Sequence, residues 1–349
     1  MLFAVAQLLG GSLLLLFGGE WVVRGASRLA ILAKLSPRFV GLTVVSLGTS
    51  APEMAVSIAT AMQGKADITI GNVVGSNLFN MLMIVGVSAT VSALSVDRQI
   101  TSFDVPAMVA ACVAMWLVGY NGNIGRVDGI ILLIAMVSYF AVSYKLGKGH
   151  TSEDMEDFVD DVAGEPLETS SFAKKAGAVL LQLLILAVGI GALILGCDWF
   201  VDGAVAFARR FGLSEAVIGL TIVSVGTSLP ELVTSVAATL KGERGIAIGN
   251  AVGSTILNIL AVLGVSAIVS PVGINVLQSI QSVDVPIMIG AAVLSWVFLR
   301  TQRTVTRLEG VMMVLLYFGY VLYLLIANGA IFSGSTTTQH LLRLPFLGT

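Results

Sequence analysis

Residues 41–53 read Gly-Leu-Thr-Val-Val-Ser-Leu-Gly-Thr-Ser-Ala-Pro-Glu, and residues 219–231 read Gly-Leu-Thr-Ile-Val-Ser-Val-Gly-Thr-Ser-Leu-Pro-Glu. In both copies a glutamate, Glu53 or Glu231, lies in a segment that is otherwise apolar enough to cross a bilayer. A carboxylate at membrane depth costs roughly 2.5–3.5 kcal/mol on insertion scales, so it persists mainly where it binds something. The two copies, each with Gly and Pro beside the glutamate, therefore indicate a membrane site for a cation.

The composition is that of a membrane protein. Of the 349 residues, 56% are hydrophobic and only 11% are charged, against about 25% charged in an average soluble domain. Apolar runs of about 20 residues, long enough to span a bilayer as a helix, recur along the whole chain. We therefore predict an all-α polytopic membrane protein. Its ten predicted transmembrane helices cover residues 2–23, 39–62, 69–94, 101–120, 126–146, 176–200, 214–239, 246–270, 282–300 and 307–327.

The sequence pattern occurs twice, with an offset of 178 residues. The match holds without a gap over about 70 residues. It resumes with the offset increased by two residues, where Asp104-Val-Pro106 aligns with Asp284-Val-Pro286. Each half therefore contains five predicted spans. The predicted domains are a first five-helix repeat (1–147), an acidic cytoplasmic linker (148–175), a second, inverted five-helix repeat (176–327) and a C-terminal tail (328–349).

An odd number of spans in each half means that the second half enters the membrane from the opposite side. With the N-terminus outside, the segments predicted to face the cytoplasm carry 14 Lys and Arg, and those outside carry 5. Lys and Arg favour the cytoplasmic side, so we predict an N-out/C-out orientation. Two inverted repeats related by a pseudo-two-fold axis in the membrane plane are a transporter architecture, with the substrate site at the midplane between them.

Each copy of the repeated stretch is expected to break its helix. Pro52 lacks an N–H and disfavours a helical residue before it, so the helix should open near Thr49–Ala51. Carbonyl groups freed at membrane depth persist only where they line a cavity or meet a ligand. Backbone oxygens, two hydroxyl groups and a carboxylate are thereby presented to one small volume, and Pro230 implies the same in the second copy. Such oxygen ligands suit hard cations such as Ca²⁺ and Na⁺ rather than zinc or copper.

The span after each broken helix adds polar groups spaced four residues apart on one face. These groups are Asn72, Ser76 and Asn80 in the first half and Asn250, Ser254 and Asn258 in the second. Such side chains can also serve only to hydrogen-bond one helix to another. Their recurrence beside both glutamate-bearing segments favours a role in the cation site.

Other parts of the sequence exclude several classes of function. The linker holds eight acidic residues between 153 and 168, and their spacing does not match an EF-hand loop. We interpret it as a solvated connection, although calcium sensing stays open. Cys112 and Cys197 are expected to be small packing residues. No histidine lies in a predicted span, so we expect neither a histidine proton relay nor an intramembrane hydrolase with a serine–histidine dyad.

At the repeated motifs the sequence resembles a known family. The segments that run from G-T-S-x-P-E to G-N-x-x-G-S-x-x-x-N are similar to the two α-repeats of the Ca²⁺/cation antiporter superfamily, and within it to the prokaryotic Na⁺/Ca²⁺ exchanger type. The resemblance covers both five-span halves. It implies ten helices, alternating access and a central group of cation sites.

The resemblance also implies a role for individual residues. Glu53 and Glu231 would ligate Ca²⁺ together with the carbonyl groups of Thr49 and Thr227. The Na⁺ sites would be completed by Ser50, Ser76, Ser228 and Ser254 and by the carbonyl groups of Ser46 and Ser224. Asn80 and Asn258 match the polar positions beside the central site.

Two positions depart from the pattern of relatives. Some relatives, including the K⁺-dependent exchangers, have Asp at the position of Asn258, so this chain lacks a third carboxylate, which argues against K⁺ co-transport. Thr255 stands where an asparagine usually follows G-S, as Asn77 does in the first half, and its consequence stays open. The linker is also too short for the large calcium-binding domains of animal exchangers.

The leading interpretation is therefore a secondary antiporter that moves Ca²⁺ out against entering Na⁺, in the cell (inner) membrane of a prokaryote. One alternative is an H⁺/Ca²⁺ antiporter, although relatives of that kind usually show G-N-x-x-E in place of G-T-S-x-P-E. A passive cation channel is a further alternative, and inverted repeats with a midplane site argue against it. The expected partners are Ca²⁺, Na⁺ and the lipid bilayer, with no enzymatic activity, cofactor, nucleic acid or obligatory protein partner.

Overall fold

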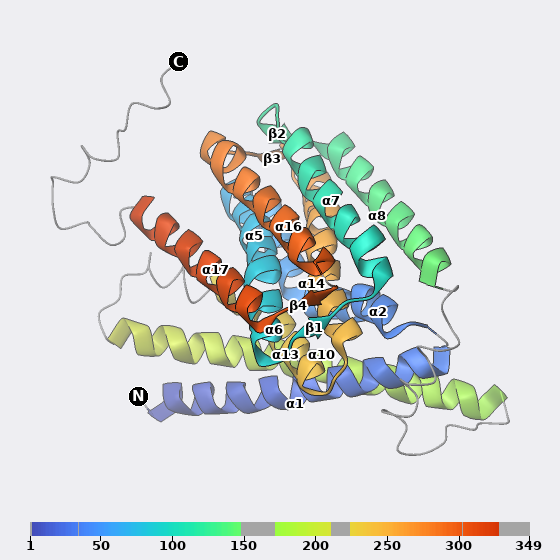
Figure 1. Ribbon diagram of the computed structural model, residues 1–349. Coiled ribbons are helices and arrows are strands. Elements are labelled where there is room, and N and C mark those ends of the chain that lie inside the picture. The colour runs from blue at the N-terminus through green and yellow to red at the C-terminus, as the bar shows by residue number, and fades with distance from the viewer. Residues whose placement is uncertain (1, 34, 148–171, 211–223, 302, 328–349) are drawn as a thin grey trace.

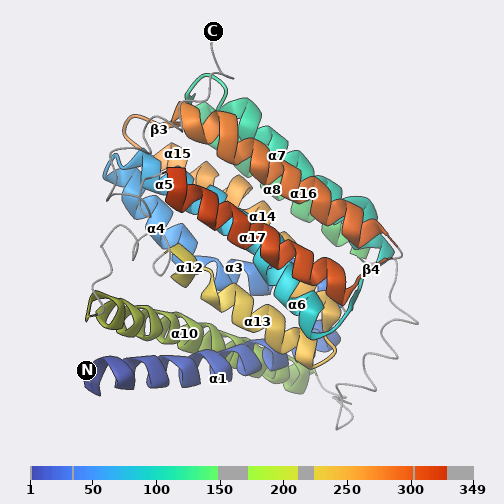
Figure 2. The same cartoon turned by 60° about the vertical axis from the view of Figure 1, so that its left-hand side comes forward.

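The computed structural model describes residues 2–33, 35–147, 172–210, 224–301 and 303–327. They form a helical bundle with two long helices, α1 (Leu2–Ala33) and α10 (Phe172–Arg210), lying across one side of it (Figure 1). Turning the molecule shows that α1 and α10 run side by side beneath the other helices (Figure 2). The elements of the two halves follow each other in the same order, and π-helical turns, labelled η, interrupt several helices.

The remaining helical elements are short segments that join into longer spans. In the first half they are α2 (Pro37–Val40), η1 (Gly41–Val45), α3 (Ser46–Thr49), α4 (Ala51–Met62), α5 (Ala66–Leu78), η2 (Phe79–Ile84), α6 (Val85–Val91), η3 (Ile100–Asp104), α7 (Val105–Val118) and α8 (Arg126–Gly147). In the second half they are α12 (Ser224–Gly226), α13 (Leu229–Leu240), α14 (Arg244–Leu257), η5 (Asn258–Leu263), α15 (Gly264–Val269), η6 (Ile280–Asp284), α16 (Val285–Arg300) and α17 (Arg307–Ala327).

The spans agree with a helical polytopic membrane protein. The described residues contain eight helices long and apolar enough to cross a membrane, or nine when Arg38–Thr49 and Ala51–Met62, bent by 49°, count as one broken span. The seventh predicted span, 214–239, begins outside the described residues, and its described end contains the apolar helix α13. Most of the acidic linker and the C-terminal tail also lie outside the described residues.

Helices α1 and α10 continue past the predicted spans 2–23 and 176–200. The two helices run antiparallel, and their backbones approach closely at glycines. A Cβ atom built at Gly18 would lie 2.9 Å from the carbonyl oxygen of Gly189, and one built at Gly25 would lie 3.2 Å from a backbone oxygen of α10. Small residues of this kind allow helices to pack tightly in a membrane. The pairing therefore stabilises helix beyond the most apolar stretch.

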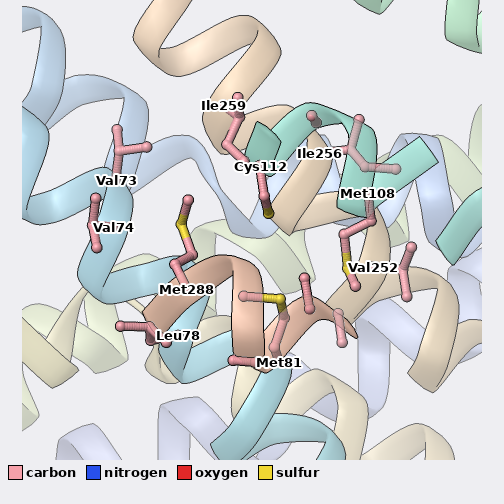
Figure 3. Packing of buried hydrophobic residues seen from close by; sticks show 14 of the residues in the cluster. Val73, Val74, Leu78, Met81, Met108, Cys112, Val252, Ile256, Ile259 and Met288 are labelled. Atoms are coloured by element: carbon pink, nitrogen blue, oxygen red, sulfur yellow. The ribbon is translucent and has the colours of Figure 1, made fainter. Parts of the chain in front are cut away.

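An apolar cluster to which both halves contribute fills the centre of the bundle (Figure 3). The side chains labelled in the figure are Val73, Val74, Leu78, Met81, Met108, Cys112, Val252, Ile256, Ile259 and Met288. Cys112 and Cys197 are both buried free thiols, and Cys112 belongs to this cluster. The cluster packs the first half against the second around the spans that carry the repeated motifs.

Equivalent contacts join the two halves in pairs. Strand β1 (Leu94–Ser95) pairs with β4 (Thr304–Val305), and β2 (Asn123–Ile124) pairs with β3 (Ile274–Asn275). Each short sheet therefore joins a loop of one half to a loop of the other. Two helix crossings join the halves in the same paired way, each through two glycines. Gly86 meets Gly310 between α6 and α17, and Gly129 meets Gly264 between α8 and α15.

One basic residue counted with the cytoplasmic loops is buried instead. Arg38, at 2% exposure, donates a hydrogen bond to the carboxylate of Asp104, which also accepts one from the Tyr139 hydroxyl at 3.0 Å. This ion pair attaches the beginning of the first broken span to η3 and α8. The residue 178 positions later is Ala216, so the sequence of the second half has no equivalent of this pair.

Candidate cation site

Both glutamate-bearing segments contain a break in the helix. In the first half the break lies at Ser50, whose ψ is 9°, and the helical segments on either side meet at 49°. Ser228 takes the same place in the second half, with a ψ of 6°. Pro52 and Pro230 lie in the first turn of the helix that follows, where a residue without an N–H is tolerated. The helix thus opens where the proline predicts.

The two glutamates are buried and are held by serines of the opposite half. Glu53 is 1% exposed, and its Oε1 accepts a hydrogen bond from the Ser228 hydroxyl at 2.9 Å. Glu231 is 0% exposed, and its Oε1 accepts one from the Ser50 hydroxyl, also at 2.9 Å. Each break therefore supplies a hydroxyl to the carboxylate of the other break.

Neither carboxylate forms an ion pair with a cationic side chain among the described residues; Arg38 pairs with Asp104, and Lys241 pairs with Glu20. The second oxygens, Oε2 of Glu53 and Oε2 of Glu231, are buried without a hydrogen-bond donor. An ionised carboxylate is costly to bury unless a charge or donors compensate it. The two free oxygens are therefore available to bind a positive charge that the neighbouring side chains do not provide.

Asparagines on the following helices position the glutamate backbones. Asn72 Nδ2 donates to the carbonyl oxygen of Glu53 at 3.2 Å and to the Ser57 hydroxyl oxygen at 2.9 Å. Asn250 makes the same two bonds in the second half, to the backbone of the second glutamate at 3.2 Å and to Ser235 at 3.0 Å. These contacts dock each broken helix onto the polar face that follows it.

The π-helical turns carry a second pair of asparagines. Asn80 lies in η2 and Asn258 in η5, and π-helical turns often occur at functional sites. Asn258 Nδ2 donates to the Ser76 hydroxyl oxygen at 3.0 Å, whereas both side-chain polar atoms of Asn80 lack a partner. Ser254 Oγ is also buried and unpartnered. The polar faces predicted from the four-residue spacing thus come together between the halves.

Unpartnered buried oxygens are concentrated at the predicted site. They include Glu53 Oε2, Glu231 Oε2, Asn80 Oδ1, Thr227 Oγ1, Ser254 Oγ and Asn258 Oδ1. Leaving a buried polar group unsatisfied costs about 1–3 kcal/mol. A hard cation would satisfy several of these oxygens at once, because Ca²⁺ takes six to eight oxygen ligands. No group of three or more His, Cys, Asp or Glu occurs in the described part of the chain, so the donor set differs from that of a transition-metal site.

Two residues predicted to offer carbonyl groups make other hydrogen bonds. The hydroxyl group of Thr49, which is not the predicted ligand, donates to Asn250 Oδ1 at 3.1 Å, and the Ser46 carbonyl accepts the Ser50 N–H at 2.9 Å. A carbonyl oxygen has a second lone pair, so Ser46 retains one position for a cation. Ser224 begins α12, and its side chain lies outside the described residues.

Sequence reasoning missed the serines one helical turn after the glutamates. Ser57 and Ser235 are both 0% exposed, and each accepts a hydrogen bond from the asparagine of the following helix. Their recurrence at the 178-residue offset was a signal that could have identified them. They belong to the scaffold of the site, because their hydroxyl groups contact asparagines rather than the carboxylates.

The chain matches known proteins over most of its length. The model of the sodium/calcium exchanger protein family matches residues 3–145 and 181–326. The sodium/calcium exchanger MaX1 of Methanosarcina acetivorans is 32% identical over 349 residues, with 91% of this chain and 97% of the relative covered. The inner membrane protein YrbG of Escherichia coli is 33% identical over 298 residues, covering 85% of this chain and 90% of the relative.

A solved structure has the same fold. The sodium-calcium exchanger NCX_Mj, soaked with 10 mM Na⁺ and zero Ca²⁺, superimposes with a TM-score of 0.77 at 28% sequence identity. The superposition covers 93% of this chain and 98% of that one. The likeness therefore extends over nearly the whole chain.

Proposed function

Since this chain belongs to the sodium/calcium exchanger protein family, we propose that it is a secondary antiporter that exchanges Na⁺ for Ca²⁺ across the membrane by alternating access. The family consists of integral membrane transporters, which are not enzymes and need no cofactor, and Na⁺ and Ca²⁺ are transported substrates. In this chain Na⁺ is the proposed coupling ion, and the proposed binding residues lie in the two broken helices and the polar faces beside them.

The cations bind between Glu53 and Glu231. The observation that carries this assignment is the pair of buried carboxylates with one free oxygen each and no cationic partner among the described side chains. Two negative charges are neutralised equally by one Ca²⁺ or by two Na⁺. The two kinds of ion can therefore compete for the same volume, which is what exchange requires.

Neutral oxygens complete the coordination. The proposed ligands besides the glutamates are the carbonyl groups of Ser46, Thr49, Ser224 and Thr227, the hydroxyl groups of Ser50, Ser76, Ser228 and Ser254, and the amide oxygens of Asn80 and Asn258. Serine hydroxyls that now donate to a carboxylate can rotate to offer a lone pair to an ion. A set with two carboxylates and several neutral oxygens accommodates a further Na⁺, and exchange then moves net charge.

The architecture that goes with this function is ten helices in two inverted repeats, residues 1–147 and 176–327, with both termini outside. This architecture is supported by contacts that occur twice between the halves, with the roles of the two halves exchanged. The β1–β4 pair corresponds to the β2–β3 pair, and the contact of Ser50 with Glu231 corresponds to that of Ser228 with Glu53. Pairs of this kind arise when two similar units are related by a two-fold axis.

Transport by the purified chain tests the proposal. Proteoliposomes are loaded with Na⁺, with K⁺ or with a pH gradient, and Ca²⁺ uptake is followed in each. Uptake driven by Na⁺ alone is expected. Uptake driven by the pH gradient without Na⁺ would instead establish an H⁺/Ca²⁺ antiporter, and uptake without any counter-ion would establish a channel.

A further inference from the structure

Arginines cluster around β1–β4, one of the two strand pairs that join the halves. The arginine cluster consists of Arg98, Arg244, Arg300, Arg303 and Arg307, all exposed. Arg244 Nη1 donates to the hydroxyl oxygen of Ser95 in β1 at 3.0 Å, and Arg307 Nη2 donates to the carbonyl oxygen of Val91 at 3.5 Å. Both guanidinium groups are thereby placed at the β1–β4 pair. The loops of this pair carry Arg98 and Arg303, and Arg300 ends α16 directly before the second loop.

Acidic residues do not cancel this charge. Three lie in the same segments, Asp97, Glu243 and Glu309. Glu243 is buried, and Glu309 accepts hydrogen bonds from the backbone and hydroxyl of Thr306 at 2.7 and 2.8 Å. The five arginines therefore outnumber the acidic side chains.

The opposite strand pair provides a comparison within the same molecule. The segments around β2 and β3, residues 119–128 and 270–281, contain one basic residue, Arg126. Arg126 begins α8 as Arg307 begins α17. The two strand pairs have the same backbone arrangement, so the excess of arginine at the β1–β4 pair is not required to form such a pair.

An apolar groove runs along the membrane face beside the arginine cluster. It has a volume of about 510 Å³ and lies between α16 and α17. Its lining residues are Ile287, Met312, Leu315, Leu316, Gly319, Tyr320 and Tyr323. Helix α16 packs on α7 and α17 packs on α6. The groove is lined mainly by α17, with Ile287 of α16 at one side.

The groove has the dimensions of a lipid chain in one leaflet. From Met312 to Tyr323 it extends about 16 Å along α17, and its near end lies about 8 Å from Arg307 along the helix. One leaflet of a hydrocarbon core that is about 30 Å thick has a similar depth. Cationic groups at the membrane boundary next to an apolar groove are the combination that anionic lipids recognise.

We propose that the arginine cluster and the α16–α17 groove form a binding site for an anionic phospholipid, with its phosphate at the arginines and one acyl chain in the groove. Guanidinium groups bind phosphate through charge-assisted hydrogen bonds. In the orientation proposed above, the lipid comes from the cytoplasmic leaflet. The chain would contact Tyr320, whose hydroxyl donates to Asp284 at 3.1 Å, and would thereby support the beginning of α16.

Gly319 makes the groove testable without disturbing the protein. A Cβ atom built at Gly319 meets no other atom within 4 Å, so Gly319→Leu should fill the groove rather than clash. Leucine also has the higher helix propensity. Helices α8 and α17 begin 181 residues apart, at Arg126 and Arg307, so the position equivalent to Gly319 is Ser138 and the glycine is not repeated in the first half.

The test uses the full-length chain, purified and stripped of lipid, with binding measured by native mass spectrometry and by thermal unfolding. The probes are dioleoyl-phosphatidylglycerol, dioleoyl-phosphatidylcholine and glycerol phosphate. We expect the anionic lipid alone to bind and stabilise the protein. Arg300→Gln with Arg303→Gln should weaken that binding about thirtyfold, from the contribution of two arginines at an anionic surface. Arg126→Gln, at the opposite strand pair, should leave it unchanged.

Each other outcome contradicts part of the site. Equal binding of the two lipids would show that the protein contacts bulk lipid only. Stabilisation by glycerol phosphate as strong as that by the lipid would remove the groove from the site. An equal loss in Arg126→Gln, or full binding in a Gly319→Leu protein that unfolds at the wild-type temperature without lipid, would overturn the proposal.

Discussion

Replacing one glutamate by glutamine should discriminate between Ca²⁺ and Na⁺. In Glu53→Gln the hydrogen bond from Ser228 can remain, because the amide oxygen takes the place of Oε1. The protein loses one negative charge at a position that is 1% exposed and has no cationic partner among the described residues. Folding should survive, since a buried carboxylate is itself unfavourable.

The size of the effect follows from the charges. At an effective dielectric constant of about 20, two unit charges 4 Å apart interact by about 4 kcal/mol, so the lost attraction is about 8 kcal/mol for a divalent ion and about 4 kcal/mol for a monovalent one. Loss of the glutamate's own burial cost reduces both values equally and leaves their difference. Ca²⁺ should therefore lose about a thousandfold more affinity than Na⁺.

Calorimetry on the purified protein measures both affinities, and ⁴⁵Ca²⁺ uptake into Na⁺-loaded proteoliposomes should fall to background. Glu20→Gln is the matched control, because Glu20 is exposed and paired with Lys241 at 3.3 Å. Exposed ion pairs contribute about 0–1 kcal/mol, so this variant should transport normally. Ca²⁺ affinity within a few-fold of wild type in Glu53→Gln would refute the assignment of the cation site.

Three further predictions concern topology, coupling and packing. Cysteines introduced in the linker and in the C-terminal tail should be labelled from opposite sides of sealed cells, and labelling from one side would contradict the inverted repeat. Na⁺-driven Ca²⁺ uptake should respond to an imposed membrane potential, with K⁺ unable to replace Na⁺; uptake indifferent to voltage would leave only neutral exchange. Gly189→Val should destabilise the protein by about 1–3 kcal/mol, because its Cβ would lie 2.9 Å from the backbone of α1, whereas Gly191→Val, with nothing within 4 Å, should be tolerated; equal unfolding temperatures would exclude the close helix approach.

The sequence predicts the spans well because hydropathy and length are local properties. It does not predict how far the helices α1 and α10 extend beyond the spans, since the glycine contacts that support the extra turns depend on which helices meet. It also counts Arg38 as a loop charge, because a buried ion pair needs Asp104, 66 residues away, to be recognised. The π-helical turns at Asn80 and Asn258 have no local signature in the sequence, although the polar residues they carry do.

The candidate site is predictable to the extent that it is repeated. Two copies of one motif identify the glutamates, serines and asparagines without any knowledge of the fold. The hydrogen-bond partners of these residues cannot be predicted in the same way. Ser50 contacts Glu231 rather than Glu53, three residues away, and this choice of partner depends on how the halves pack. A serine in a helix, such as Ser57, is also too common to attract notice by itself.

The reciprocal contacts between the halves have a consequence for how such a chain can arise. A contact in which residue i meets j while the equivalent of j meets the equivalent of i is what an isologous dimer makes. A five-helix ancestor inserted in both orientations would have made the serine–glutamate bonds and the strand pairs between two identical subunits, and fusion would have preserved them. Positions that break the symmetry, such as Arg38 opposite Ala216 and Asn77 opposite Thr255, then record where the subunits have since become unequal. At these positions the two halves, and therefore the pathways that they form toward the two sides of the membrane, can acquire different properties.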